Sequence, residues 1–191
     1  MFDRCQWLNE PRAWRLDKGA LSVVTDAATD FWRETHYGFT RDSGHFFGCD
    51  TAGDFTATLR VRAAYESLYD QAGLMVRLNA ATWLKAGIER SDGEALLGSV
   101  LTLGQSDWAT GPFTGDPADF RLRLTVAAGV LRLQASADGQ RWPLVRLCPF
   151  PAAAAYRVGP MCCTPERAGL KVLFSDFVVG APMSKDLHDL T

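Results

Sequence analysis

The sequence predicts an all-β fold of two stacked antiparallel sheets, on three observations. Short runs rich in aromatic and β-branched residues recur along the chain, separated by Gly, Asp and Asn turns. Several runs alternate apolar and polar side chains, which is the two-residue period of a strand with one buried face. No stretch keeps a 3.6-residue apolar period, so helices are not expected. The length of 191 residues suits one β-sandwich, and we expect residues 1–191 to form a single domain.

Eight segments are the clearest strand candidates. They are Leu21–Thr25, Asp54–Arg62, Gln71–Arg77, Trp83–Glu89, Ser99–Leu103, Phe120–Ala127, Val130–Ser136 and Leu170–Val179. In Asp54–Arg62 apolar residues alternate with Thr and Arg, which predicts a buried face and a cationic outer face. Phe120–Ala127 and Val130–Ser136 alternate in the same way, so Ala127–Gly129 is predicted to be a hairpin turn, and Asp138-Gly139 the next turn.

The two central strands fix their own register. Their apolar residues must share the core face: Leu74 and Val76 with Leu84, Ala86 and Ile88. If Arg77 lies opposite Trp83, the other face pairs Met75 with Lys85, Gly73 with Gly87, and Gln71 with Glu89. That face combines polar, charged and aromatic groups around two glycines that admit close approach, as a binding surface would. The alternative is the ordinary solvated face of an antiparallel sheet.

The remaining chain carries fewer signals. Pro149 and Pro151 begin a connector that continues through the short alanine run, which is too short for a stable helix. The polar tail from Ala181 onward is expected to fray.

Charge and hydropathy exclude several functions. Twenty Lys and Arg against 22 Asp and Glu give a net charge of −2, so the chain lacks the basic excess that nucleic acid or an anionic membrane would require. No apolar run approaches the ~20 residues of a membrane-spanning helix. Met1–Pro11 is too polar for a signal peptide, so a cytoplasmic location is expected.

The five cysteines form no C-x-x-C pair. Their odd number, in a chain with enough apolar residues to fold without cross-links, predicts reduced thiols with a packing role. Cys162 and Cys163 are adjacent, so in a strand their side chains would point to opposite faces.

Two further segments combine aromatic and acidic residues. Thr29–Gly38 contains Asp30, Trp32, His36 and Tyr37, and a later loop contains Asp107 beside Trp108. Indole and phenol rings stack on sugar rings or anchor interfaces, while neighbouring acids fix a ligand's orientation. The alternative is that Trp32, Trp83 and Trp108 only fill the ends of the sandwich.

These segments, taken in order, resemble a known family. Similarity lies in Asp30-Phe31-Trp32, in Tyr69–Arg77, in Trp83–Glu89 and in Ser106-Asp107-Trp108, and continues through Asp138–Trp142, Val158–Met161 and Gly169–Phe177. The family has no assigned function and includes a fungal "regulation of enolase" protein. The resemblance implies a concanavalin A-like jelly-roll sandwich, whose superfamily contains sugar-binding modules and glycoside hydrolases. It places the ligand cleft on the concave sheet.

The first hypothesis is therefore a binding protein for a carbohydrate or a similar polar small molecule. Its candidate ligand-binding residues are Asp30, Trp32, His36, Tyr37, Asp70, Gln71, Arg77, Trp83, Lys85, Glu89, Asp107 and Trp108. This hypothesis requires no cofactor and no metal ion.

Two alternatives use the same face. A glycoside hydrolase or lyase would need two carboxyl groups, and the candidates are Glu89 with Asp70 or Asp107. A regulatory domain would instead dock a protein partner on the exposed aromatic residues. A metal site from His45, Cys49, Asp50 and Asp54 can be drawn, but this stretch is more typical of turns around a short strand. Hydrolase elbows, phosphate loops and zinc-helix motifs are absent from the sequence.

Overall fold

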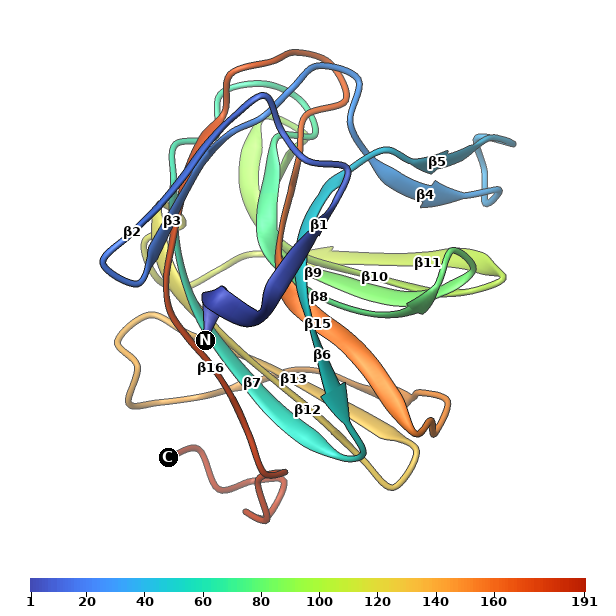
Figure 1. Cartoon of the computed structure of the whole chain (residues 1–191), viewed down its shortest axis with the longest axis vertical. Coiled ribbons are helices and arrows are strands. Elements are labelled where there is room, and N and C mark those ends of the chain that lie inside the picture. The colour runs from blue at the N-terminus through green and yellow to red at the C-terminus, as the bar shows by residue number, and fades with distance from the viewer.

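The computed structural model describes residues 1–191 and is built from two large antiparallel sheets (Figure 1). The first sheet has the order β1-β6-β15-β8-β9-β10-β11. Its strands are β1 (Cys5–Leu8), β6 (His45–Ala52), β8 (Gln71–Asn79), β9 (Thr82–Ser91), β10 (Glu94–Leu103), β11 (Gln105–Gly111) and β15 (Ala155–Cys163). A short 3-10 helix, η1 (Phe2–Arg4), precedes β1.

The second sheet has the order β14-β13-β12-β7-β16-β3-β2. Its strands are β2 (Ala13–Asp17), β3 (Ala20–Val24), β7 (Phe55–Ala63), β12 (Asp119–Ala127), β13 (Val130–Ser136), β14 (Leu144–Pro149) and β16 (Lys171–Gly180). A separate hairpin, β4 (Phe31–Arg33) with β5 (Thr40–Asp42), lies outside the stacked sheets (Figure 1). The predicted all-β sandwich is confirmed.

All eight predicted segments are strands, because their alternating side chains meet between the sheets. On β7, Phe55, Ala57, Leu59 and Val61 are buried, while the residues between them are at least partly exposed. The main core joins 34 buried residues from both sheets. The turn between β12 and β13 is as predicted, with Ala128 and Gly129 at positive φ. No helix has the length and hydropathy to cross a membrane.

The structure corrects two expectations about the ends of the chain. Cys5 and Cys49 lie opposite one another on β1 and β6 and form a disulfide, so the prediction of five reduced thiols is wrong for this pair. The tail does not fray. Arg132 donates hydrogen bonds to the carbonyl oxygens of Lys185, Asp186 and Leu187 and so holds the tail against the second sheet.

Cys162 and Cys163 point to opposite faces of β15, as the sequence predicts for adjacent strand residues. Cys162 belongs to the main core, whereas Cys163 belongs to a second cluster of eight buried residues on the far side of the first sheet. The first sheet is therefore covered on both faces.

Candidate functional site

The floor of the candidate site is the outer face of β8 and β9. Their register pairs Gln71 with Glu89, Gly73 with Gly87, Met75 with Lys85, and Arg77 with Trp83. This register confirms the predicted one, and its cause is the apolar set on the core side: Leu74, Val76, Leu84, Ala86 and Ile88 are all buried in the main core.

This face is not a solvated sheet surface, contrary to the alternative drawn from the sequence. Gln71 is 4% exposed, Lys85 3% and Glu89 8%. The second cluster covers part of the face with Phe31, Trp32 and Trp83, among others. Polar groups buried to this degree require partners, either in the protein or in a ligand.

The β4–β5 hairpin covers the face and is anchored at both ends. Arg77 donates two hydrogen bonds to the Asp42 carboxylate, at 2.7 and 2.8 Å. At the other end, the Arg33 N–H donates to Ser106 Oγ at 2.9 Å, and the Arg33 guanidinium donates to the Gly104 carbonyl at 2.9 Å. Bidentate pairing of this kind fixes orientation as well as distance.

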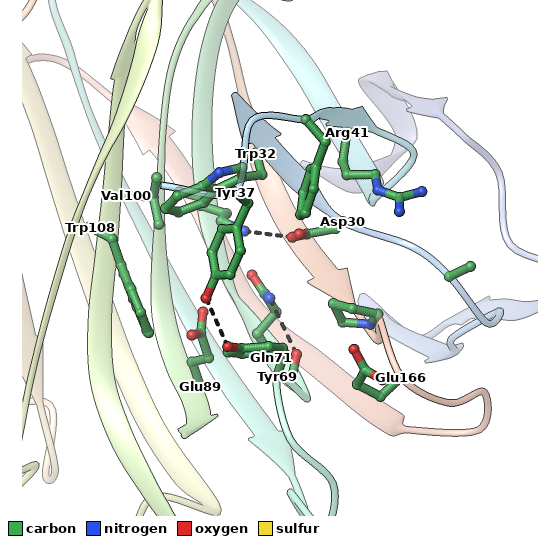
Figure 2. A pocket seen from close by; sticks show the side chains of 14 residues that line it. Asp30, Trp32, Tyr37, Arg41, Tyr69, Gln71, Glu89, Val100, Trp108 and Glu166 are labelled. Carbon is green, nitrogen blue, oxygen red and sulfur yellow. Dashed lines mark hydrogen bonds and ion pairs between the residues drawn. The ribbon is translucent and has the colours of Figure 1, made fainter. Parts of the chain in front are cut away.

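Between the hairpin and the sheet lies a cavity of about 230 Å³, which we call the hairpin pocket (Figure 2). Its lining comes from the hairpin, the sheet face and three loops. The lining residues are Ala28, Asp30, Trp32, Tyr37, Phe39, Arg41, Tyr69, Gln71, Lys85, Glu89, Val100, Trp108, Pro165 and Glu166.

Aromatic rings form the walls of the hairpin pocket. Trp108 is 36% exposed and Tyr37 44% exposed, so both present ring surface at the mouth. Trp32 is nearly buried and packs edge-on against Tyr37 and Trp108, with ring centroids 5.6 and 6.4 Å apart. The hydroxyl groups of Tyr37 and Tyr69 share a hydrogen bond of 3.0 Å across the mouth (Figure 2).

A buried ion pair lies at the base of the pocket. Lys85 Nζ donates to Asp30 Oδ1 at 3.0 Å, and the same oxygen accepts the Phe31 N–H at 2.7 Å. Burial alone would lower the pKa of Lys85, but the Asp30 carboxylate, aided by Cys163 and Glu89, outweighs burial and raises that pKa. Lys85 therefore stays charged despite its burial, and the Asp30 carboxylate beside it offsets that charge.

Glu89 has no such partner. Burial raises the pKa of its carboxyl group to about 7, Lys85 opposes that rise, and Asp30 adds to it. No protein group hydrogen-bonds to this carboxyl, and Gln71 uses only its amide nitrogen, which donates to the Tyr69 carbonyl at 3.2 Å. The floor thus offers a ligand unused donors and acceptors.

Seven of the twelve ligand-binding candidates from the sequence line the hairpin pocket. They are Asp30, Trp32, Tyr37, Gln71, Lys85, Glu89 and Trp108. The other five lie outside its lining. Trp83 is fully buried beneath the hairpin, Arg77 anchors Asp42, and His36 is exposed and packs edge-on against Tyr37.

Asp70 and Asp107 are the remaining two, and each is held by an arginine. Asp70 is fully buried, where it accepts hydrogen bonds from Arg167 and from the N–H groups of Glu66 and Ser67. Burial acts to raise the pKa of Asp70, but these hydrogen bonds outweigh it and lower that pKa. Its role is to fix the loop before β8.

Asp107 points to the face of the first sheet opposite the pocket. It lies across from Leu101, a core residue, and pairs with Arg146 of β14 at 2.7 Å. Neither Asp70 nor Asp107 therefore shares the cavity with Glu89, and the two carboxyl pairs proposed for hydrolysis are not assembled.

Half of the pocket lining was not selected from the sequence. These residues are Ala28, Phe39, Arg41, Tyr69, Val100, Pro165 and Glu166. Phe39 and Arg41 lie just beyond the aromatic segment, and Tyr69 directly precedes Asp70, so a wider reading of both segments would have included them. Pro165 and Glu166 come from the β15–β16 loop, which carries no local signal.

The glycines on the floor serve the sheet rather than a ligand. Gly73 and Gly87 face one another, and a Cβ on either would overlap the backbone of the neighbouring strand, at Ala86 or Ala72. The structure also brings together no group of three or more His, Cys, Asp and Glu side chains that could hold a metal ion. His45 accepts a hydrogen bond from the Asp26 N–H instead, and Cys49 is in the disulfide.

Comparison with known proteins shows where this chain has relatives. Residues 7–182 match the model of a family described as "Protein of unknown function (DUF1349)". The chain is 60% identical over 185 residues to "Regulation of enolase protein 1" of Saccharomyces cerevisiae, covering 97% of this chain and 93% of the yeast protein. A crystal structure of a functionally unknown protein from Saccharomyces cerevisiae matches with a TM-score of 0.95 at 57% identity, over 96% of this chain and 99% of that one.

More distant structures share the fold alone. A GH43 protein, BlXynB of Bacillus licheniformis, matches with a TM-score of 0.73 at 12% identity, over 93% of this chain and 37% of the larger one. The exoplasmic/lumenal domain of VIP36, in its Ca2+/Man3GlcNAc-bound form, matches with a TM-score of 0.55 at 8% identity, over 99% and 88% of the two chains.

Proposed function

The chain belongs to the DUF1349 family of proteins of unknown function, and from that premise we propose that it binds a carbohydrate or a similar polar small molecule in the hairpin pocket. One observation carries this proposal. Three buried polar side chains, Gln71, Lys85 and Glu89, face a cavity and leave hydrogen-bonding capacity unused within the protein. Such groups cost free energy unless a ligand or water satisfies them.

The donors and acceptors in the pocket are mixed. Gln71 offers a carbonyl oxygen, Lys85 two further N–H groups, and Asp30 a second carboxylate oxygen. A sugar hydroxyl can donate and accept at once, so a polyhydroxylated ligand satisfies such a set better than a purely donating or accepting one.

The aromatic walls supply the apolar half of recognition. Trp108 presents its ring to the cavity from β11, at the side of the polar floor near Glu89 (Figure 2). A sugar ring has an apolar C–H face and a polar rim, which matches an indole wall beside a polar floor. The Man3GlcNAc-bound form of VIP36, a protein of the same fold class, adds support from a distant structure.

The test compares two exposed indoles. Wild-type protein is titrated with a panel of monosaccharides and oligosaccharides, followed by thermal shift and isothermal titration calorimetry. Trp108→Ala should weaken, by about tenfold, the binding of any sugar that the wild-type protein binds. A tenfold loss corresponds to roughly 1.4 kcal/mol, which is the size expected for a lost aromatic contact. Trp14→Ala is the control, because Trp14 is 38% exposed and does not line the pocket.

Equal binding by both tryptophan variants and wild type would place the sugar elsewhere and contradict the proposal. So would the failure of every sugar to bind the wild-type protein.

A second candidate function is the docking of a protein partner. The yeast relative is named for the regulation of enolase, and the rim of the pocket exposes Tyr37, Phe39 and Trp108. Exposed aromatic residues are typical anchors of protein interfaces. This function is favoured if Trp108→Ala weakens capture of a purified partner such as enolase while no sugar binds.

A further inference from the structure

The size and charge of the hairpin pocket restrict its ligand further; this step rests on the proposed function. At about 230 Å³, the cavity is smaller than the roughly 300–1,000 Å³ typical of pockets for drug-sized ligands. The cavity matches one sugar ring with its hydroxyl groups, and a second ring would extend beyond it.

Side chains bound the pocket at two opposite sides of its floor. Trp108 stands on one side of the floor and Glu166 on the other, with the hairpin residues above (Figure 2). Tyr69 closes the rim near Trp108, where it is fixed by the Tyr37 hydroxyl. A polysaccharide chain needs space on either side of each bound ring, whereas here Trp108 and Glu166 stand at the two sides of the floor.

The buried charges also select the ligand. Lys85 and Asp30 offset each other's charge, so the net charge of the pocket floor depends on whether Glu89 is protonated. Lys85 approaches Glu89 from β9, Asp30 from the segment before β4, and Tyr69 from the loop before β8. Cys163 approaches it from β15, and burial raises the pKa of this thiol well above its usual range, so it is uncharged. The hydrogen bond with Tyr37 raises the pKa of Tyr69 to about 12, so the Tyr69 phenol is uncharged at neutral pH. Arg41 and Glu166, the other charged groups of the lining, are exposed and of opposite sign.

An ionised Glu89 would place a second negative charge beside Asp30 with no cation of its own. The pKa of Glu89 is therefore raised to about 7, mainly because burial favours the protonated acid. A protonated carboxyl donates one hydrogen bond and accepts another, which is the pattern of a sugar hydroxyl.

We propose that the hairpin pocket takes a single neutral sugar ring and that protonated Glu89 donates a hydrogen bond to a hydroxyl group of that ring. Glu89 thereby determines specificity. The Lys85–Asp30 pair is neutral as a unit and protonated Glu89 is uncharged, so a carboxylate or ammonium group on the ligand would enter the pocket without a counter-ion of its own. Uronic acids and amino sugars therefore bind more weakly than the parent sugar.

The experiment uses the whole chain and calorimetry at pH 5.5 and pH 8.5. The probes are glucose, galactose, mannose, xylose and arabinose, then the uronic acid, the 2-amino sugar and the β-linked oligosaccharides of the best binder. With a pKa of about 7 for Glu89, the protonated fraction falls roughly thirtyfold between the two pH values, and affinity should fall by about the same factor.

Three variants separate the proton from the side chain. Glu89→Gln keeps a hydrogen-bond donor, so it should bind within about threefold of the wild type at pH 5.5 and lose the pH dependence. Glu89→Ala should lose binding at both pH values. Glu166→Gln is the control, an exposed lining residue whose change should leave the thirtyfold fall intact.

The outcomes distinguish this inference from the proposed function. Tighter binding of an oligosaccharide, equal binding of the uronic acid, affinity independent of pH, or loss of binding in Glu89→Gln at both pH values would each overturn the inference while leaving sugar binding intact. If no sugar of any length binds the wild-type protein at either pH, the proposed function itself is wrong.

Discussion

At the scale of single residues, the distinctive feature of the hairpin pocket is that some of its buried polar groups lack a hydrogen-bond partner in the protein. Lys85 has Asp30 as a partner at 3.0 Å, whereas Glu89, on the same strand and face, has no hydrogen-bond partner in the protein. Burying a carboxyl group without a hydrogen-bond partner costs much more free energy when the group is ionised than when it is protonated. The protonation of Glu89 is therefore coupled to the stability of the whole fold.

The first prediction follows from that coupling. The pKa of Glu89 is about 7 in the folded protein against an ordinary value of 4.5. The folded state holds the proton more tightly, so stability declines as pH rises from 4.5 to about 7 and is constant above. Glu89→Gln removes this penalty and should be more stable than wild type at pH 8 by on the order of 2–3 kcal/mol, with little difference at pH 4.5.

Urea unfolding followed by circular dichroism at the two pH values measures this difference. Glu166→Gln, in which an exposed carboxyl is changed, should show no such pH-dependent gain. A Glu89→Gln protein that is less stable than wild type at pH 8 would contradict the raised pKa of the Glu89 carboxyl group.

At the scale of elements, the pocket depends on strands that approach closely. Gly73 of β8, Gly87 of β9 and Gly98 of β10 form one row across the first sheet. For the first two, any side chain would meet the backbone of the adjacent strand, while a Cβ on Gly98 meets only ordinary contacts, the nearest at 3.5 Å. The close approach of β8 and β9 beneath the polar residues thus depends on glycine at positions 73 and 87.

Gly73→Ala should therefore force β8 and β9 apart and destabilise the protein by about 3 kcal/mol, as overpacking does when nothing flexible can yield. Gly98→Ala is the matched control, a strand glycine in the same row whose change should alter stability by less than about 0.5 kcal/mol. Both are measured by urea unfolding. Equal stabilities of the two variants would refute the close approach of β8 and β9.

The same elements show how far the sequence could predict the site. The register of β8 and β9 was predictable, because Leu74, Val76 and Leu84 can occupy only the core side. Burial of the opposite face was not, since it depends on the β4–β5 hairpin, which is distant in the sequence and packs over it. That packing rests on Arg77 meeting Asp42 across 35 positions, for which the sequence has no local pattern.

Long-range pairing also explains the errors in the choice of residues. Asp70 was a reasonable ligand candidate because it precedes Gln71. In the structure its carboxylate accepts hydrogen bonds from Arg167, which lies 97 positions later in the sequence. Asp107 was chosen for its neighbour Trp108, but successive strand residues point to opposite faces. The disulfide was missed because Cys5 and Cys49 meet only once β1 is placed beside β6.

At the scale of the whole molecule, the two ends of the chain are attached to different sheets. The disulfide holds β1 at the edge of the first sheet, and the tail crosses the second sheet over Arg123 and Arg132. Trp142 stacks under Arg123, with the guanidinium carbon 4.4 Å from the ring centroid. Each sheet thus has one of the chain's ends fixed to it.

The disulfide closes a loop with a sequence separation of 44, so its loss should release chain entropy in the unfolded state. Cys5→Ser should lower the free energy of unfolding by about 2–4 kcal/mol, and a reducing agent should bring wild type to the same value. Urea unfolding with and without reductant measures this. Cys148→Ser, which changes a free cysteine, should respond to reductant as wild type does. Insensitivity of wild type to reductant would contradict the bond.

The uneven exposure of the tryptophans makes the molecule an optical reporter of its own pocket. Of six indoles, only Trp14 and Trp108 are substantially exposed, so most of the water-sensitive emission comes from these two rings. A Trp14→Phe background leaves Trp108 as the most exposed indole, and it lies at the mouth of the hairpin pocket. Occupancy can then be followed by fluorescence without any dye or label.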